Sequence, residues 1–147
     1  MEILPHFWIG YYKENSNIII KQKKIKNIIH LSKYETFIKK MDVEEIRVPI
    51  DYDDTSSIDE INDIMYQQLY DITDFIHTKI MNNENVLLLG YLNKQDIDVI
   101  VIAYFIRYGK ININNAILFL KSKKIDIFYP KCLFYHSLNK FYAYLNK

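Results

Sequence analysis

The chain has 147 residues, the size of one domain, and its 50% hydrophobic content can supply a core without a disulfide or a metal. Lys and Arg total 19 against 18 Asp and Glu, so the net charge of +1 provides no overall field for a polyanion. The single cysteine, Cys132, excludes an internal disulfide and a cysteine-rich zinc site. We therefore expect one globular domain over residues 1–147, with no cofactor and no metal.

Two further features bear on location. The longest apolar stretch, residues 97–106, is interrupted by Asp98 and is about half of the ~20 residues that a membrane helix needs. The first six residues contain no basic region followed by an apolar run, so no secretory signal is visible. Together with the lone cysteine, these features predict a cytoplasmic protein that does not enter a membrane.

Short apolar runs bounded by polar residues or breakers predict the β-strands. They cover residues 7–10, 25–31, 45–48 and 86–89. Between the last two runs, apolar residues from Ile58 to Ile80 recur at three- and four-residue steps and predict a long amphipathic helix. Ser57, with Glu60 three residues later, forms a capping-box pattern at its start.

The second half of the chain predicts helices. Residues 97–108 are apolar on nearly every side, which favours a central helix with buried Ile100 and Ile102, and Gly109 is expected as its left-handed cap. Further helices are predicted over residues 112–123 and 130–145, the latter opening with Pro130. The predicted fold is α/β, a single twisted and mostly parallel sheet of four to five strands flanked by helices.

The loop over residues 90–96 is the predicted site, because ligands of such sheets bind where a strand leads into a helix. Around it the chain resembles the dual-specificity protein phosphatases. Their active-site segment is an apolar strand, His-Cys-x-Ala-Gly-x-x-Arg-Ser, and a helix with Ala-Tyr-Leu, here Ala103-Tyr104-Phe105. The resemblance continues over residues 4–10, 25–32, 48–50 with 53–55, and 116–124 followed by Pro130 and Phe134.

The catalytic positions of that family hold other residue types in this chain. The family's histidine, cysteine, loop glycine, arginine and hydroxyl residue fall on Leu89, Gly90, Asn93, Asp96 and Ile97. Glycine offers no nucleophile, and a carboxylate in place of the arginine repels a phosphate dianion, since two unit charges at ~4 Å interact by about 4 kcal/mol at an effective dielectric near 20. Only the general acid has a counterpart, Asp54. The substitutions predict a pseudophosphatase, that is, a protein that is not an enzyme.

A protein of this kind is expected to act as a protein-binding or regulatory module in phospho-signalling. Tyr91 and Leu92 at the loop tip, with Lys94, are the predicted protein contacts, because an aromatic and a leucine suit a protein interface better than a phosphate cradle. Asp54 with Asp53 is more simply explained as part of a solvated turn before the long helix.

Two alternatives keep the chain an enzyme, as an unconventional phosphatase. Asp96-Ile97-Asp98-Val99 matches the Asp-x-Asp-x-Val core of aspartate-nucleophile phosphatases, although six loop residues separate it from the strand. A first helical turn with two carboxylates is the simpler interpretation. Cys132 is the other candidate nucleophile, with His136 four residues later, and a half-buried thiol is the simpler interpretation there.

The remaining predictions concern partners and source. Two lysine clusters, residues 21–26 and 121–124, lack arginines and stacking aromatics, so solvated faces are favoured over nucleic-acid binding. The expected partner is an unidentified protein, and a second copy of the chain is compatible with the sequence without being implied. A composition with only two arginines resembles that of a large DNA virus such as a poxvirus, which would place the protein in the host cytoplasm.

Overall fold

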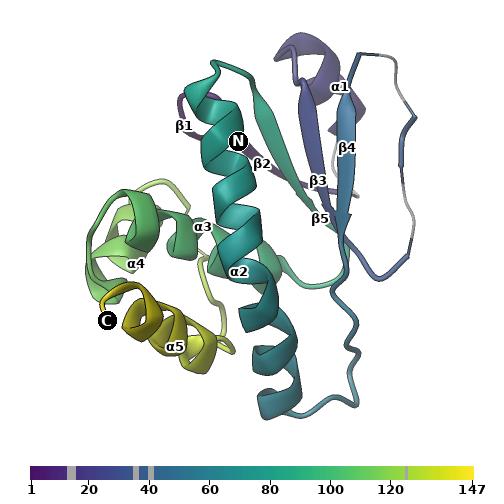
Figure 1. The fold of residues 1–147 in the computed structure, drawn as a ribbon. Helices are drawn as coiled ribbons and strands as arrows, with labels where there is room; N and C mark the ends of the chain where they lie inside the picture. The colour runs from purple at the N-terminus through teal and green to yellow at the C-terminus, as the bar shows by residue number, and fades with distance from the viewer. Residues whose placement is uncertain (13–15, 35–36, 40–41, 125) are drawn as a thin grey trace.

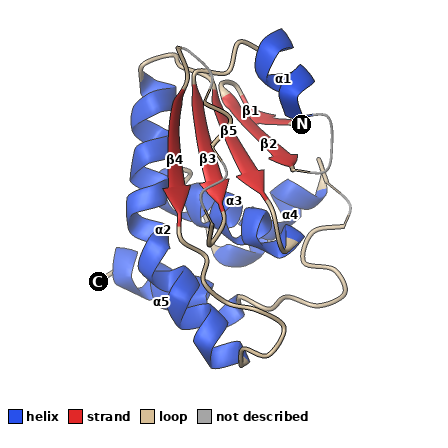
Figure 2. Ribbon diagram, turned by 90° about the vertical axis from the view of Figure 1, so that its right-hand side faces the viewer, coloured by secondary structure: helices blue, strands red, loops and turns tan. Residues whose placement is uncertain are grey.

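The structure is a computed structural model that describes residues 1–12, 16–34, 37–39, 42–124 and 126–147. Its centre is a five-stranded sheet in the order β1-β2-β5-β3-β4 (Figure 2). The strands are β1 (Glu2–Leu4), β2 (Phe7–Tyr11), β3 (Asn27–Leu31), β4 (Glu44–Val48) and β5 (Val86–Gly90). β1 runs antiparallel to β2, and all other pairs are parallel. The predicted mostly parallel sheet is confirmed.

Helices cover both faces of the sheet (Figure 1). The helices are α1 (Ser16–Gln22), α2 (Ile58–Met81), α3 (Lys94–Tyr108), α4 (Ile113–Lys121) and α5 (Tyr135–Leu145). α2 to α5 pack together against one face and form the larger part of the core, whereas Ile20 of α1 and Ile25 pack with Ile28 and Leu87 in a small cluster on the other face. Because both faces are covered, every residue of β3 and β5 is buried.

The helix predicted to be central is the most buried one. In α3 all residues from Gln95 to Ile106 are buried, and Ile100 and Ile102 are fully inaccessible. α3 contacts α2, α4, α5 and β5, so each of its sides meets another element. A helix without a polar face can be stable in water only in such surroundings. This confirms the predicted architecture.

α2 begins as the sequence predicts, and a polar network joins it to α5. The Ser57 hydroxyl accepts a hydrogen bond from the Glu60 N–H at 3.1 Å, which caps the helix. On the buried face, the Asn62 side chain donates to the Leu133 carbonyl, and its Oδ1 accepts from the Ser137 N–H, both at 2.8 Å. The network ties the start of α5 to the first turns of α2.

Two local predictions were wrong, and one helix was not predicted. α1 (Ser16–Gln22) has no counterpart among the predicted elements, and only its last two residues belong to the lysine cluster of residues 21–26. Gly109 has φ −82°, and the left-handed residue is Lys110; glycine is needed because a Cβ would lie 2.6 Å from the Phe105 carbonyl oxygen. The last helix does not open at Pro130 but begins at Tyr135. The segment before it is held instead by Gln95, which donates to the carbonyls of residues 129 and 131.

None of the helices within the described ranges is both long enough and apolar enough to cross a lipid bilayer.

Candidate functional site

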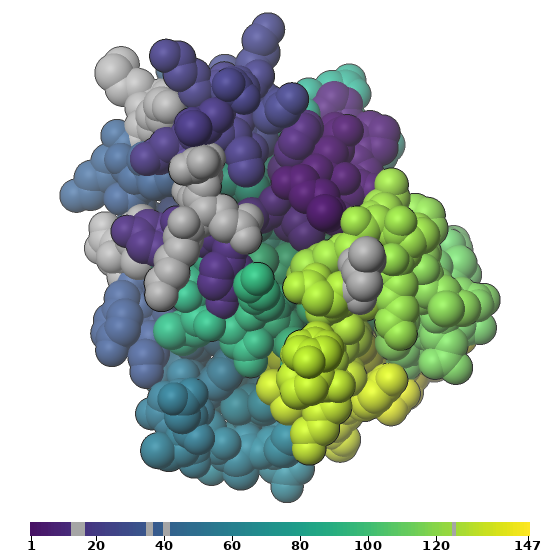
Figure 3. Space-filling model, turned by 180° about the vertical axis from the view of Figure 1, so that it is seen from behind, coloured from purple at the N-terminus to yellow at the C-terminus, as the bar shows by residue number. Residues whose placement is uncertain are grey.

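The loop after the central strand is the candidate site. It leaves β5 at Gly90 and enters α3 at Lys94, and β5 is flanked by β2 and β3, so the loop lies over the middle of the sheet. Asn93 caps α3, because its side chain accepts a hydrogen bond from the Gln95 N–H at 2.9 Å. In Figure 3 this green-teal part of the chain reaches the surface between the segment that precedes α2 and the segment that joins α4 to α5.

Gly90 lies where a side chain would collide with the helix. A Cβ at this position would be 2.8 Å from Cδ1 and 3.0 Å from Cγ1 of Ile97, and 3.4 Å from Cε2 of Tyr11. Its φ is not positive, so space and not backbone conformation requires the glycine. The two positions that the resemblance assigns to the family's cysteine and hydroxyl residue are therefore in contact, and Ile97 fills the room that a larger residue 90 would need.

Asp96 is fully buried and bonded to a tyrosine from another loop. Its Oδ1 accepts a short hydrogen bond from the hydroxyl of Tyr52, which follows β4 and is itself buried. Among the described residues, Oδ2 has no hydrogen-bond partner. Burial raises the pKa of Asp96 to about 7, against the effect of the Tyr52 bond, and burial together with the Asp96 charge raises the pKa of Tyr52. The inner side of the loop is thus a desolvated carboxyl–phenol pair.

Asp98 binds the segment between α4 and α5. Its Oδ1 accepts from Lys124 Nζ at 2.6 Å and its Oδ2 accepts from the Phe128 N–H at 3.0 Å. Burial raises its pKa, although Lys124 opposes the shift. Both carboxylates of the Asp-x-Asp-x-Val match lie in the first turns of α3, as predicted, but they are buried with specific partners and do not face solvent.

Tyr91, at the tip of the loop, is held by a polar contact with a side chain of the sheet. Its hydroxyl lies 2.6 Å from Nδ1 of His30 in β3, and Nε2 of His30 lies 2.8 Å from Oε1 of Glu45 in β4. Glu45 in turn accepts hydrogen bonds at 2.8 Å from the N–H groups of Ile38 and Lys39. A three-member polar chain therefore connects the loop to two strands.

The outer rim of the loop is exposed. Leu92 is 50% exposed, and Lys94 is exposed with its ammonium 5.6 Å from the centre of the Tyr11 ring. Tyr12, 57% exposed, stacks on Tyr91 with ring centres 4.8 Å apart. Of the three predicted contact residues, Leu92 and Lys94 reach the surface, whereas the half-buried Tyr91 turns its hydroxyl toward His30. We call Tyr12, Leu92 and Lys94 the rim.

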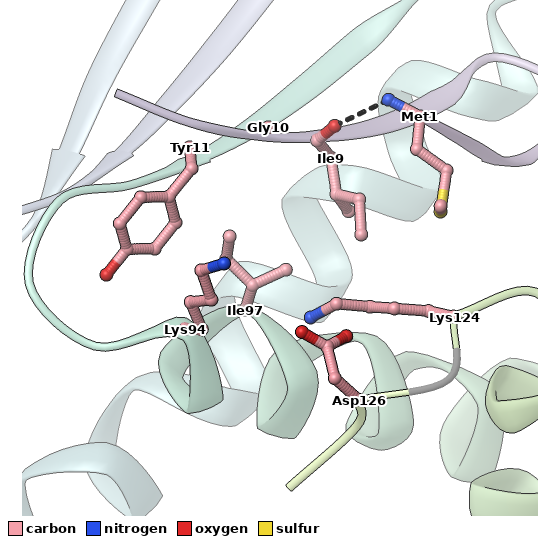
Figure 4. Close-up of a pocket in the computed structure, with 8 residues that line it drawn as sticks. All are labelled: Met1, Ile9, Gly10, Tyr11, Lys94, Ile97, Lys124 and Asp126. Atoms are coloured by element: carbon pink, nitrogen blue, oxygen red, sulfur yellow. Dashed lines mark hydrogen bonds between the residues drawn. The ribbon is translucent and has the colours of Figure 1, made fainter. Parts of the chain in front are cut away.

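A cavity of about 210 Å³ lies beside the loop (Figure 4). Its lining consists of Met1, Ile9, Gly10, Tyr11, Lys94, Ile97, Lys124 and Asp126. The Met1 ammonium donates to the Ile9 carbonyl at 2.9 Å, Lys124 bonds to Asp98, and Figure 4 shows the Asp126 carboxylate next to the Lys124 ammonium. Two of its cations are therefore already bound by protein oxygens.

Asp53 and Asp54 lie in an exposed turn before α2. Asp53 Oδ1 accepts from both the N–H (2.8 Å) and the hydroxyl (2.6 Å) of Thr55, and these bonds lower its pKa. This is the side-chain geometry of an Asx turn, and the sequence predicted a solvated turn for Asp53 and Asp54. Among the described residues, no group of three or more His, Cys, Asp or Glu side chains could hold a metal ion.

Cys132, the other candidate nucleophile, is half-buried in the segment before α5. Its Sγ accepts a hydrogen bond from the Phe134 N–H at 3.4 Å, and burial raises the pKa of its thiol. A raised pKa keeps the thiol protonated and weakly nucleophilic. His136 lies within α5, whereas Cys132 precedes it, so the two do not share a helical face as the four-residue spacing suggested.

Sequence reasoning missed two residues of this site. Tyr52 precedes the predicted turn and has no motif of its own, although its position two residues before Asp54 places it close to the loop in the resemblance. His30 also stands in no motif, because no other histidine lies at a metal-ligand spacing from it. Its place inside a strand, between Ile29 and Leu31, was the available sign that its ring is buried and must find polar partners.

Comparison with known proteins supports the fold. No protein-family model matches the chain. The chain is 31% identical over 97 residues to "Putative tyrosine phosphatase 123R" of Invertebrate iridescent virus 6, a match that covers 66% of this chain and 64% of that protein. The chain thus spans less than two thirds of the length of this viral relative.

Solved structures match over almost the whole chain. Human DUSP28 has a TM-score of 0.79 at 15% identity, covering 99% of this chain and 96% of that one. Human tyrosine phosphatase-like serine/threonine/tyrosine-interacting protein gives 0.79 at 17%, covering 99% and 97%. A leucine rich repeat and phosphatase domain containing protein from Entamoeba histolytica gives 0.75 at 20%, covering 99% and 91%. The chain has the fold of the dual-specificity phosphatases.

The prediction that the chain is not an enzyme is contradicted by these comparisons. The viral relative carries the name of a tyrosine phosphatase, and the structures that share the fold include DUSP28 and DUSP15. Replacement of the family's cysteine and arginine by Gly90 and Asp96 was the basis of the prediction. Similarity to phosphatases favours an enzyme, and the substitutions in the loop do not by themselves show that the chain lacks activity.

Proposed function

We propose that the chain binds a protein partner through the rim, as a module of phospho-signalling built on the dual-specificity phosphatase fold. The observation that carries the proposal is the half-exposed Leu92 on a loop that is held firmly from inside. A leucine in water at the tip of an ordered loop costs free energy that a partner would recover by covering it.

The geometry of the loop supports a binding role. Asn93 caps α3, Tyr91 bonds to His30, and Asp96 bonds to Tyr52, so the backbone that carries Leu92 and Lys94 is tied at three points. A preorganised surface loses little conformational entropy on association. Tyr12 adds an exposed aromatic ring, the side-chain type most typical of interface hot spots.

The chemistry of the rim indicates what it would bind. An apolar side chain, an aromatic ring and one ammonium group suit a segment with an apolar residue next to a carboxylate or a phosphate. The structural neighbour named serine/threonine/tyrosine-interacting protein carries interaction in its name and shares the fold, which supports the same kind of role for this chain.

Affinity capture with a matched control tests this proposal. The wild-type chain, the variant Leu92→Glu with Lys94→Glu, and the control Leu118→Glu are used as baits in extracts of the cells in which the protein occurs. Leu118 on α4 is 63% exposed, so the control also adds a charge at an exposed leucine. We expect one partner that the wild type and the control retain and the rim variant loses. Equal retention by the rim variant contradicts the proposal.

A second candidate function is phosphatase activity, which the similarity to the viral relative favours. The chain would need a nucleophile other than a loop cysteine. An assay with an aryl phosphate between pH 5 and 8, on the wild type and on Asp96→Asn and Cys132→Ser, tests the two groups that the sequence suggested. Turnover that one substitution abolishes supports this function, and no turnover at any pH contradicts it.

A further inference from the structure

The polar chain of Tyr91, His30 and Glu45 brings together a hydroxyl, an imidazole and a carboxylate, and the proposed binding function uses it only to hold the loop. Its distances are 2.6 Å from the Tyr91 hydroxyl to His30 Nδ1 and 2.8 Å from His30 Nε2 to Glu45 Oε1. The three residues come from the loop, β3 and β4, and the side chains of His30 and Glu45 are 0% and 6% exposed. Three elements thus converge to align three groups.

The hydrogen-bond partners of Glu45 and His30 determine where the protons of the three groups lie. Burial alone would raise the pKa of Glu45, but hydrogen bonds from the Ile38 N–H, His30 and the Lys39 N–H together lower it, so Glu45 is a carboxylate. A carboxylate only accepts, and His30 Nε2 must therefore carry the proton. Burial lowers the pKa of His30 despite Glu45, so the ring is neutral and its Nδ1 is an acceptor. The Tyr91 hydroxyl donates to Nδ1.

This is the arrangement of a nucleophile, a base and a group that orients the base. The hydroxyl is hydrogen-bonded to a neutral imidazole, and the carboxylate fixes the tautomer and would stabilise the imidazolium formed when the ring takes a proton. Two backbone N–H groups hold the carboxylate in place. Tyr91 also directly follows Gly90, so its hydroxyl belongs to the loop at the carboxyl end of the central strand.

We propose that Tyr91 is a nucleophilic residue whose hydroxyl accepts a phosphoryl or phosphonyl group from an activated ester, with His30 as base and Glu45 as positioning residue. In this step the Tyr91 oxygen forms a bond to phosphorus, and the bond from phosphorus to the leaving group breaks. The leaving group departs with the electron pair of that bond. The hydroxyl proton moves to His30 Nδ1, and the product is an O-phosphoryl or O-phosphonyl tyrosine.

Covalent labelling of the intact protein tests the proposal independently of any binding partner. A fluorophosphonate probe is the electrophile, because it is uncharged at phosphorus and releases fluoride. Peptide mapping then ranks the labelled tyrosines. Simple accessibility would favour Tyr129 and Tyr34, which are 77% and 68% exposed, over the half-buried Tyr91. We expect the adduct on Tyr91 first.

Variants show whether Tyr91 is labelled because its hydroxyl is activated or because it is accessible. Tyr91→Phe should remove the fast adduct, and His30→Gln should slow labelling of Tyr91 by about 100-fold, the lower range for loss of a general base. Glu45→Gln should slow it as well. Tyr135→Phe is the matched control, because it also removes one tyrosine hydroxyl, and Tyr135 is 51% exposed on α5 and belongs neither to the rim nor to the Tyr91–His30–Glu45 set.

Two outcomes would overturn the proposal. One is a labelling order that follows exposure in the wild-type protein, which needs no variant and so stands even if His30→Gln fails to fold. The other is a folded His30→Gln, shown by an unchanged circular dichroism spectrum, that labels Tyr91 as fast as the wild type does. The affinity capture above remains informative in either case, because the rim residues are not part of this chain of groups.

Discussion

Asp96 shows at the scale of one residue how the interior of the loop is organised. An isolated buried carboxylate is costly, and protonation is the usual response. Here burial raises the pKa of Asp96 to about 7, and the Tyr52 hydroxyl supplies one hydrogen bond. The carboxyl group therefore changes charge near neutral pH while it remains covered by a side chain from the segment between β4 and α2.

The raised pKa predicts a pH-dependent stability. The folded protein holds the Asp96 proton up to about pH 7, whereas the unfolded chain releases it near 3.8. The stabilisation from this proton is complete below about pH 4 and is lost as pH rises through 7. Asp96→Asn removes this loss, so the variant should gain on the order of 3 kcal/mol over the wild type at pH 8 and much less at pH 4. Denaturant unfolding at pH 4 and pH 8 measures the difference in unfolding free energy between the variant and the wild type. The same difference at both pH values would contradict the raised pKa of Asp96.

Gly90 and Ile97 are predicted to be energetically coupled. Gly90→Ala places a Cβ 2.8 Å from Ile97 Cδ1, so it should lower the free energy of unfolding by about 1–3 kcal/mol through overpacking. Ile97→Val deletes that methyl group and should cost about 0.5–1.5 kcal/mol alone. The double variant should lose less unfolding free energy than the sum of the losses in the two single variants. A double-mutant cycle in urea measures this, and simple additivity would count against the contact.

At the scale of elements, the attachment of α5 to α2 rests on buried polar groups. Asn62→Ala leaves the Ser137 N–H and the Leu133 carbonyl without their side-chain partner, and each unsatisfied buried group costs about 1–3 kcal/mol. We expect a loss near 3 kcal/mol in thermal or urea unfolding. Asn146→Ala, which removes an exposed bond to Tyr142 at the chain end, is the control and should change stability by less than about 0.5 kcal/mol. Equal effects would contradict the role of the network.

The elements with strong periodic patterns were predictable from sequence. The apolar steps from Ile58 and the Ser57 cap defined α2 correctly, and the uninterrupted apolar content of residues 97–106 identified the most buried helix. Tertiary contacts decided the rest. The start of α5 depends on Gln95, which holds the preceding segment through backbone carbonyls, and no local pattern near Pro130 reports that contact.

The site was predictable in position but not in content. The strand-to-helix transition at Gly90 and the exposure of Leu92 and Lys94 follow from local sequence and from the resemblance. The pairing of Asp96 with Tyr52 and of Tyr91 with His30 joins residues 44 and 61 positions apart, and such long-range contacts leave no local pattern. They became visible only once β3, β4 and β5 were aligned in one sheet.

At the scale of the whole molecule, the sheet and the helices that cover it hold the loop after β5 at the carboxyl end of the central strand. β5 is buried on both faces, and the loop that follows it is tied to β3 and to the segment after β4. The exposed side chains at this loop are those of the rim, Tyr12, Leu92 and Lys94. The central claim of this account is that a protein partner binds there.

Site-specific photo-crosslinking tests that claim most directly. A benzophenone amino acid replaces Leu92 in one version of the protein and Leu118 in another, and each is irradiated in the cells in which the protein occurs. Leu92 and Leu118 are 50% and 63% exposed, so the probe at the control position is at least as accessible as the probe at position 92. The account predicts one defined covalent complex with a partner from position 92 and none from position 118. Absence of a complex at position 92, or the same complex from both positions, would contradict it.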